Sequence, residues 1–399
     1  MSSATTSDVK WTAPQCVLWT SEVTITLNVT NNAGLTTTKS FSVYAPRCPA
    51  RVISAGGAYS LALRGKGTVW AWGANDSGEL GDGTYEPHST PVQVPGLTDA
   101  TSLASSGGTS LASRADGTVW AWGNNYGGAL GDDTPFNRNF PAQVSGVSGV
   151  IAVAAGAASL ALRDDGTVWA WGSNRNGQLG NGTTNTNPNP TPGQVIGLTH
   201  ITAIATGSLH VLALRDDGTV WAWGFNYHGE LGDGTTDDRN LPVQVPGLTG
   251  VIAVAAGYYH SLALRNDGTV WAWGWNLRGE LGDGRIATQR ASPGQVPGLT
   301  GVIDVAAGDS YSLALLSDGT LRAWGLNDFR QLGDGTNTNR HTPVQVSGLT
   351  GVTSVVAGAG HSLVLRNDQA VWAFGSNYHG QLGDGSQPTS TGPAKASLP

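Results

Sequence analysis

The stretch VIAVAAGYYHSLALRNDGTVWAWGWNLRGELGDG occupies residues 251–284, and near-copies of it recur along most of the chain. Ala-Trp-Gly closes the central part of six copies, with successive Trp residues at Trp72, Trp122, Trp171, Trp223, Trp273 and Trp324. A seventh copy ends in Phe374-Gly375, and successive copies are 50, 49, 52, 50, 51 and 50 residues apart. A constant period of this length indicates a repeat architecture.

Each copy contains four short β-prone runs and no helical pattern. In the fifth copy they cover 251–256, 261–265, 269–273 and 293–296, with the turn sequence Asn-Asp-Gly at 266–268. Runs such as Val-Trp-Ala-Trp are apolar on both sides, which indicates strands buried on both faces. Four-stranded blades stacked around an axis bury each sheet between two neighbours. The sequence therefore predicts an all-β fold, a seven-bladed β-propeller of four-stranded antiparallel blades.

The repeats set the predicted domain boundaries. The propeller is expected over 51–399, and a short β-hairpin segment over 1–50 precedes it. The predicted blades cover about 51–100, 101–149, 150–199, 200–250, 251–301, 302–351 and 352–399.

The patterns G-x-x-H-S-L-A-L and W-G-x-N-x-x-G-x-L-G-D-G resemble the regulator of chromosome condensation repeat family, and they cover nearly all of 51–399. The resemblance implies a seven-bladed propeller that serves as a binding platform. Members of this family include an exchange factor for the small GTPase Ran, a plant UV-B photoreceptor and secreted bacterial inhibitors of β-lactamase. Because one fold carries such different functions, the fold alone does not choose among them.

The leading segment alternates apolar and polar residues over 21–29 and again over 35–44, around the turn sequence Asn-Asn-Ala-Gly. Pairing residues whose numbers sum to 64 places Val23 opposite Phe41 and Val29 opposite Leu35. The same register places Cys16 opposite Cys48, the only two cysteines of the chain. We expect a disulfide between them, which implies an oxidising, extracellular or cell-surface location; two free buried thiols are the alternative. The segment is similar to the last strands of bacterial extracellular immunoglobulin-like modules.

Composition excludes several classes of protein. The chain has 15 Trp and only 12% charged residues, which argues against disorder. Its net charge of −7 argues against nucleic-acid binding. No apolar run is long enough to span a membrane, and the first residues show no signal-peptide pattern, so the extracellular expectation depends on the cysteines.

Three recurring residue sets have the composition of a chemical site. Trp residues in the third strand of each copy could form a light-sensing array, but filling the space between blades is favoured. His210, His260 and His361 recur on separate copies, so hydrogen bonding between loops is favoured over metal binding. The Asp of the G-D-G ending lacks the alternating oxygen ligands of a calcium loop, and turn capping is favoured. We expect no metal, no cofactor, no catalytic residues and no enzymatic activity.

A candidate binding surface lies on one side of the predicted propeller. The turn after the first strand and the loop after the third strand open on the same side of an antiparallel blade, and their variable positions are rich in aromatic residues. Tyr, Trp and Arg dominate interaction hot spots, so we expect a protein partner here, with a glycan as an alternative ligand and a small-GTPase exchange factor as an alternative function. The candidate residues are Tyr59, Tyr126, Tyr227, His228, Tyr258, Tyr259, Trp275, Arg278, Tyr311, Phe329, Tyr378 and His379.

Overall fold

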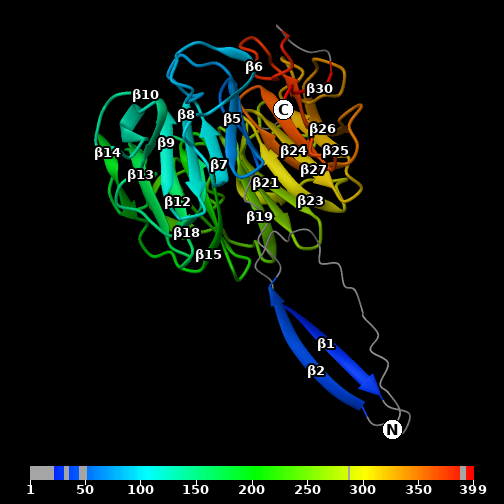
Figure 1. Cartoon of the computed structure of the whole chain (residues 1–399). Coiled ribbons are helices and arrows are strands. Elements are labelled where there is room, and N and C mark those ends of the chain that lie inside the picture. The colour runs from blue at the N-terminus through cyan, green and yellow to red at the C-terminus, as the bar shows by residue number, and fades with distance from the viewer. Residues whose placement is uncertain (1–21, 31–35, 45–51, 286–287, 387–391) are drawn as a thin grey trace, which may run out of the picture. The chain divides into compact units, whose positions relative to one another are not determined.

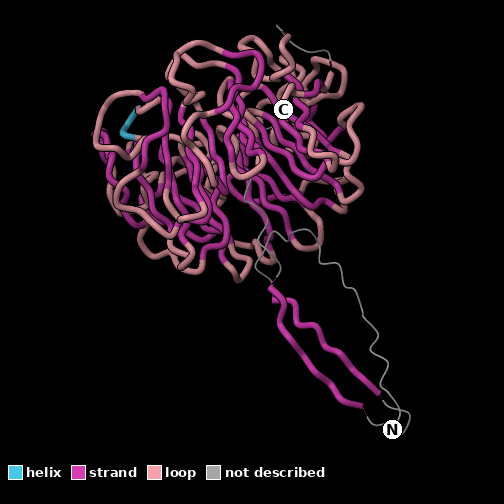
Figure 2. The backbone as a smooth tube through the Cα atoms, in the orientation of Figure 1, coloured by secondary structure: helices cyan, strands magenta, loops and turns pink. Residues whose placement is uncertain are grey.

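The structure is a computed structural model, and it describes residues 22–30, 36–44, 52–285, 288–386 and 392–399. Residues 51–399 form one compact unit and residues 1–50 another. The larger unit contains seven four-stranded antiparallel sheets arranged as blades of a propeller, which confirms the predicted fold (Figure 1). Figure 2 shows strands joined by loops, with one short helical turn in the described residues.

Each blade uses four consecutive strands, and its strands are hydrogen-bonded in chain order. The first four blades contain β3 (Ile53–Ala55), β4 (Tyr59–Arg64), β5 (Thr68–Gly73) and β6 (His88–Gln93); β7 (Ala100–Ser106), β8 (Thr109–Arg114), β9 (Val119–Gly123), the 3-10 turn η1 (Tyr126–Gly128) and β10 (Arg138–Gln143); β11 (Val150–Ala155), β12 (Ala158–Arg163), β13 (Val168–Asn174) and β14 (Asn185–Gln194); and β15 (Ile201–Thr206), β16 (His210–Arg215), β17 (Val220–Gly224) and β18 (Arg239–Gln244). The last three contain β19 (Val251–Ala256), β20 (His260–Arg265), β21 (Val270–Trp275) and β22 (Gln289–Gln295); β23 (Val302–Ala307), β24 (Tyr311–Leu316), β25 (Leu321–Gly325) and β26 (Arg340–Gln345); and β27 (Val352–Ala357), β28 (His361–Arg366), β29 (Val371–Gly375) and β30 (Ala394–Lys395).

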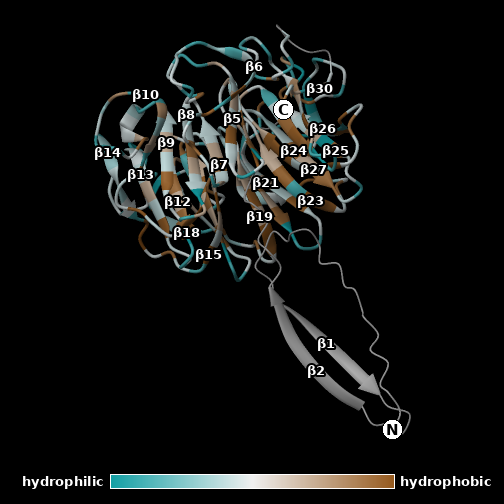
Figure 3. Cartoon of the chain, in the orientation of Figure 1, coloured by the Kyte–Doolittle hydropathy of each residue, from teal (hydrophilic) through white to brown (hydrophobic). Residues whose placement is uncertain are grey.

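The core lies between the blades, as the two-sided apolar strands predict. Figure 3 shows hydrophobic residues concentrated in the propeller strands and hydrophilic residues in the connecting loops. One core cluster joins Leu262 and Leu281 of the fifth blade to Trp324 of the sixth, and all three side chains are buried. Equivalent clusters join five other pairs of neighbouring blades.

The contact between two neighbouring blades is called a seam here, and a side chain buried in it a seam residue. The Trp of each Ala-Trp-Gly is a seam residue, which confirms that it fills the space between blades. Trp273 has no exposed surface, and its indole Nε1 donates a 2.7 Å hydrogen bond to the backbone oxygen of Glu230 in the preceding blade. Ser261 Oγ donates to the same oxygen at 2.8 Å. The same indole-to-carbonyl bond joins each of the other five Trp to the blade before it, at 2.7–2.9 Å: Trp72, Trp122, Trp171, Trp223 and Trp324.

The recurring His residues also join blades. Nε2 of His210 lies 2.9 Å from Ser261 Oγ in the next blade, and His260 makes the same contact with Ser312. His361 of the seventh blade lies 3.0 Å from Ser60 of the first, which closes the ring. Because the Ser hydroxyl donates to a carbonyl, the His must donate through Nε2. The predicted hydrogen-bonding role is confirmed.

The leading hairpin contains β1 (Glu22–Thr30) and β2 (Thr36–Tyr44). Its register differs from the prediction: Val23 pairs with Val43 and Ile25 with Phe41, so paired numbers sum to 66 and not 64. A two-residue slip leaves the alternation of apolar and polar positions in the sequence in phase, so this pattern could not distinguish the two registers. Cys16 and Cys48 lie outside the described residues.

Candidate functional site

The loop after the third strand of every blade is folded around one buried Asn. In the fifth blade Asn276 Oδ1 accepts the Leu281 N–H at 3.0 Å, and Nδ2 donates to the Arg285 backbone oxygen at 3.3 Å. The Asp of G-D-G forms a local turn, with Asp334 Oδ1 accepting the N–H of Thr336 at 2.9 Å. The turn-capping role expected for the Asp is confirmed. The Asn holds the two positions that follow it in defined places on the surface.

Six rings from the fourth and fifth blades form one contiguous group, which we call the aromatic cluster: Phe225, Tyr227, His228, Tyr258, Tyr259 and Trp275. His228 lies at its centre. Its ring centroid is 4.3 Å from that of Trp275 and 5.2 Å from that of Tyr259. Tyr258 contacts Tyr259 edge-on at 4.4 Å. The rings therefore support one another across two blades as a preorganised surface.

Exposure within the aromatic cluster is uneven. Tyr227 is 65% exposed and Tyr258 39%, whereas His228, Tyr259 and Trp275 are half-buried beneath them. Ring contacts between the two blades account for the half-buried rings. Exposed Arg278 borders the cluster on the fifth blade.

The sequence analysis missed one member of the aromatic cluster and one side chain next to it. Phe225 contacts Tyr259 at 5.8 Å, and Leu277 is 45% exposed beside Arg278. Phe225 occupies the same repeat position as Trp275, directly after Trp-Gly, and this equivalence is the signal that could have identified it.

Buried carboxyl groups lie beneath and beside the cluster. Burial raises the pKa of Glu230 and of Glu280 to about 7, and their Oε2 atoms accept the backbone N–H groups of His228 and Arg278 at 2.9 and 2.8 Å. Burial, with Tyr258 alongside, raises the pKa of Tyr259 to about 12. At neutral pH these two carboxyl groups are therefore only partly ionised, Asp309, whose pKa burial raises to about 6, adds negative charge near Tyr259, and the Arg278 guanidinium lies at the border of the cluster.

Tyr59 and Tyr311, predicted on the binding face, are instead fully buried. They occupy the place of the recurring His, and their hydroxyls donate to backbone oxygens of the next blade at 2.7 and 2.6 Å. Each Tyr hydroxyl is hydrogen-bonded to the Ser of the next blade that a His contacts at other seams. An aromatic residue that the sequence placed on the surface is therefore a seam residue.

The other predicted residues lie on different blades. Phe329 and Tyr378 pack edge-on at 6.2 Å between the sixth and seventh blades, and His379 is exposed next to them. Tyr126, 62% exposed, lies on the second blade with Arg175 over its ring at 5.8 Å. The structure thus brings together five predicted residues with Arg278 at their border, and distributes the others around the face.

On the opposite face, Arg and Asp side chains form ion pairs with one another, and Arg guanidinium groups lie over Trp rings. Arg163 Nη1 lies 2.9 Å from Asp165, and its guanidinium lies over Trp169 at 5.9 Å. The same Arg–Asp ion pair occurs in five blades, and in each of them the Arg guanidinium lies over the ring of the first Trp in the third strand. Of the residues described, no three His, Cys, Asp or Glu are grouped as metal ligands, and no helix is long and apolar enough to cross a membrane.

Comparison with known proteins places the propeller in one family. The RCC1-like domain matches residues 150–399, and the regulator of chromosome condensation (RCC1) repeat matches 66–113 and 116–162, with a further repeat match at 51–79. The human E3 ubiquitin-protein ligase HERC2 is 55% identical over 47 residues, which are 11% of this chain and 1% of that protein. The chain thus spans only a small part of this curated relative.

Solved structures extend the likeness to most of the chain. A chain from the crystal structure of Kap60 bound to yeast RCC1 (Prp20) is 26% identical with a TM-score of 0.73, covering 82% of this chain and 83% of that one. Prp20p from Saccharomyces cerevisiae, described with its binding to Gsp1p and histones, gives the same identity and TM-score over 82% and 85%. Human WBSCR16 is 25% identical with a TM-score of 0.75, over 83% and 94%. This chain therefore belongs to the regulator of chromosome condensation (RCC1) repeat family.

Proposed function

We propose that the chain is a non-enzymatic binding scaffold that recognises a protein partner through the face formed by the loops after the first and third strands of each blade. The aromatic cluster is the observation that carries the proposal. Exposed rings supported from below lose little side-chain entropy on binding, which is why Tyr and Trp dominate hot spots. The opposite face offers mainly ion pairs, which contribute little.

The family supports a protein as the partner. The similar yeast protein is described with Kap60, Gsp1p and histones, all of them proteins. None of these names transfers to this chain, because the shared fold does not fix the partner.

A matched pair of variants tests the proposed face. A protein that the unmodified chain captures from the native organism's surroundings is first isolated. Its affinity is then compared for the unmodified chain, a Tyr227→Ser/Tyr258→Ser double variant, and Ile196→Ser. Ile196 is 54% exposed on the connection between the third and fourth blades, at the opposite end of the strands. We expect the double variant to lose at least tenfold in affinity for the captured protein, and Ile196→Ser to retain it. Equal loss in both, or loss only in Ile196→Ser, contradicts the proposed face.

The alternative is an exchange factor for a small GTPase, favoured by the similarity to Prp20p described with Gsp1p. Accelerated nucleotide release from purified small GTPases at catalytic concentration of this chain would establish the alternative. A glycan array probed with the same variants separates the third expectation, sugar binding by the exposed rings.

We also propose an extracellular or cell-surface location, supported by the pair of cysteines. Because the hairpin register differs from the predicted one, it does not place Cys16 directly opposite Cys48. The proposal is supported only by the fact that the chain has two cysteines. Peptide mapping without reduction is expected to find a peptide linking Cys16 to Cys48. Two thiols that react with an alkylating reagent in the unreduced, denatured chain would remove this support.

A further inference from the structure

The seam between the second and third blades departs from the repeat at one residue. In the other six blades a Glu or Gln precedes the Leu of the loop, and its side chain accepts the backbone N–H two residues earlier at 2.7–2.9 Å. In the second blade this residue is Ala129, and the N–H is that of Gly127. Because Ala has no acceptor, the Gly127 N–H makes no hydrogen bond to any described residue.

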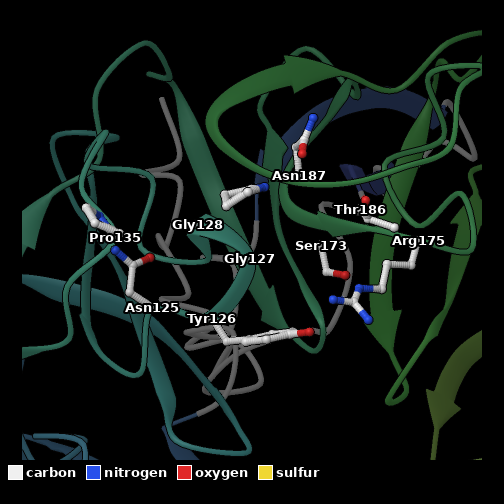
Figure 4. A pocket seen from close by; sticks show the side chains of 10 residues that line it. Asn125, Tyr126, Gly127, Gly128, Pro135, Ser173, Arg175, Thr186 and Asn187 are labelled. Carbon is white, nitrogen blue, oxygen red and sulfur yellow. The ribbon is translucent and has the colours of Figure 1, made fainter.

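A cavity of about 310 Å³ opens at this position, and Gly127 is part of its lining. Tyr126 and Ser173 line it from the second and third blades, and β14 adds Thr186 and Asn187. Figure 4 shows the Tyr126 ring, the Ser173 hydroxyl and the Arg175 guanidinium around the same opening. Such a volume is at the lower end for a small-molecule site and suits one side chain of a partner.

The cavity has a single charge, and it is positive. Arg175 is the only ionisable group other than Tyr126 among the ten lining residues. Its guanidinium lies 5.8 Å from the centroid of the Tyr126 ring and pairs with no carboxylate in the described part of the chain. Ser173 is 6% exposed, and its hydroxyl makes no hydrogen bond to the described residues. Three donors therefore surround the cavity without a protein acceptor.

We propose that this cavity binds the carboxylate of an acidic side chain, Asp or Glu, presented by a protein partner. A guanidinium stacked on a ring is held in place and offers paired donors to a carboxylate. The backbone N–H and the hydroxyl can donate to the remaining lone pairs. One positive charge balances one carboxylate, whereas a phosphate with nearly two negative charges would remain under-compensated.

The inference rests on the proposed function, since it names a chemical feature that the partner would carry. It uses blades other than those of the aromatic cluster. A measurement on the cavity with a short peptide therefore fails or succeeds independently of partner capture, and distinguishes the two proposals.

The sequence allows the Gly127 amide to be observed alone. Tyr126-Gly127 is the only Tyr-Gly pair in the chain, so protein labelled with ¹³C-carbonyl Tyr and ¹⁵N Gly gives one signal in a carbonyl-selected amide spectrum. The probe is the acetylated and amidated tripeptide Ala-Glu-Ala, and the control probe is Ala-Gln-Ala. We expect saturable movement of the Gly127 signal with the Glu peptide at millimolar concentrations, and roughly tenfold weaker binding of the Gln peptide.

Variants identify the groups responsible. Arg175→Gln is expected to weaken the binding of the Glu peptide by about tenfold or more. Arg285→Gln, at an exposed arginine of the fifth blade, is expected to leave it unchanged. Ala129→Gln restores the acceptor of the other blades and is expected to weaken binding by capturing the Gly127 N–H. The proposal is overturned if the Gly127 signal does not move, if the Gln peptide moves it equally, or if Arg175→Gln binds as the unmodified chain does.

Discussion

Trp273 gives the sharpest test of how neighbouring blades are held together. Its side chain is fully buried, and Trp273→Ala should cost about 3–5 kcal/mol of unfolding free energy, the usual loss for a large aromatic removed from a core. The Glu230 carbonyl that accepts the indole N–H also accepts Ser261 Oγ, so the substitution leaves no orphaned acceptor. The expected loss is therefore mainly one of volume.

The seventh blade supplies a matched variant. Phe374 holds the place of Trp273 there, fully buried and without an N–H donor. Trp273→Phe should therefore cost only about 1–2 kcal/mol, one hydrogen bond and a smaller ring. Urea unfolding at neutral pH, followed by circular dichroism, measures both variants against exposed Tyr227→Ser as control. If Trp273→Phe were as damaging as Trp273→Ala, or if Trp273→Ala shifted the midpoint no more than the control, the reasoning would be refuted.

Three further predictions use positions where one blade differs from another. Burial lowers the folded-state pKa of His260 to about 3, so the unfolded chain takes up protons first and stability is lost as pH falls from about 6.5 towards 3. His260→Tyr, which copies Tyr311 of the next blade, should reduce this loss of stability in acid. Thermal melts at pH 7 and pH 4.5 measure it. Burial raises the pKa of Glu230 to about 7, so its cost grows as pH rises from 4.5 to 7; Glu230→Gln, copying Gln331, should stabilise the chain at pH 8 and change it little at pH 4.5, and equal melting shifts at both would contradict this. Gln369 has φ of 64° where the other blades have Gly in the same turn, so Gln369→Gly should stabilise by about 1 kcal/mol in urea unfolding, and a destabilised variant would show that the strain is absent.

The repeat made the fold predictable to within a few residues. In the fifth blade the expected strand 251–256 matches β19, and the others differ by up to four residues at either end. The loops that share one side of the propeller were predictable as well, because the order of antiparallel strands determines them. Pattern alone could not reveal that Tyr59 and Tyr311 are buried, since a ring at that position is recognised as a seam residue only through its Ser partner in the next blade.

The acidic-side-chain cavity was also beyond the sequence reasoning. The cavity depends on the absence of a side-chain acceptor at Ala129. It also depends on the placement of Arg175, from the adjacent blade, over the Tyr126 ring. Interactions across a seam join residues about 50 positions apart, and a reading of each copy by itself does not combine them.

Every blade consists of four consecutive strands, and the first and seventh blades meet through the same kinds of side-chain contact as any other pair. The place where the chain starts and stops is thus arbitrary with respect to the ring. A circularly permuted chain, with its old ends linked and new ends opened in another connection between blades, would keep every strand pairing. For the same reason, a gene could gain or lose one whole repeat without interrupting a sheet. The number of blades is then determined by how many of them pack side by side into a closed ring.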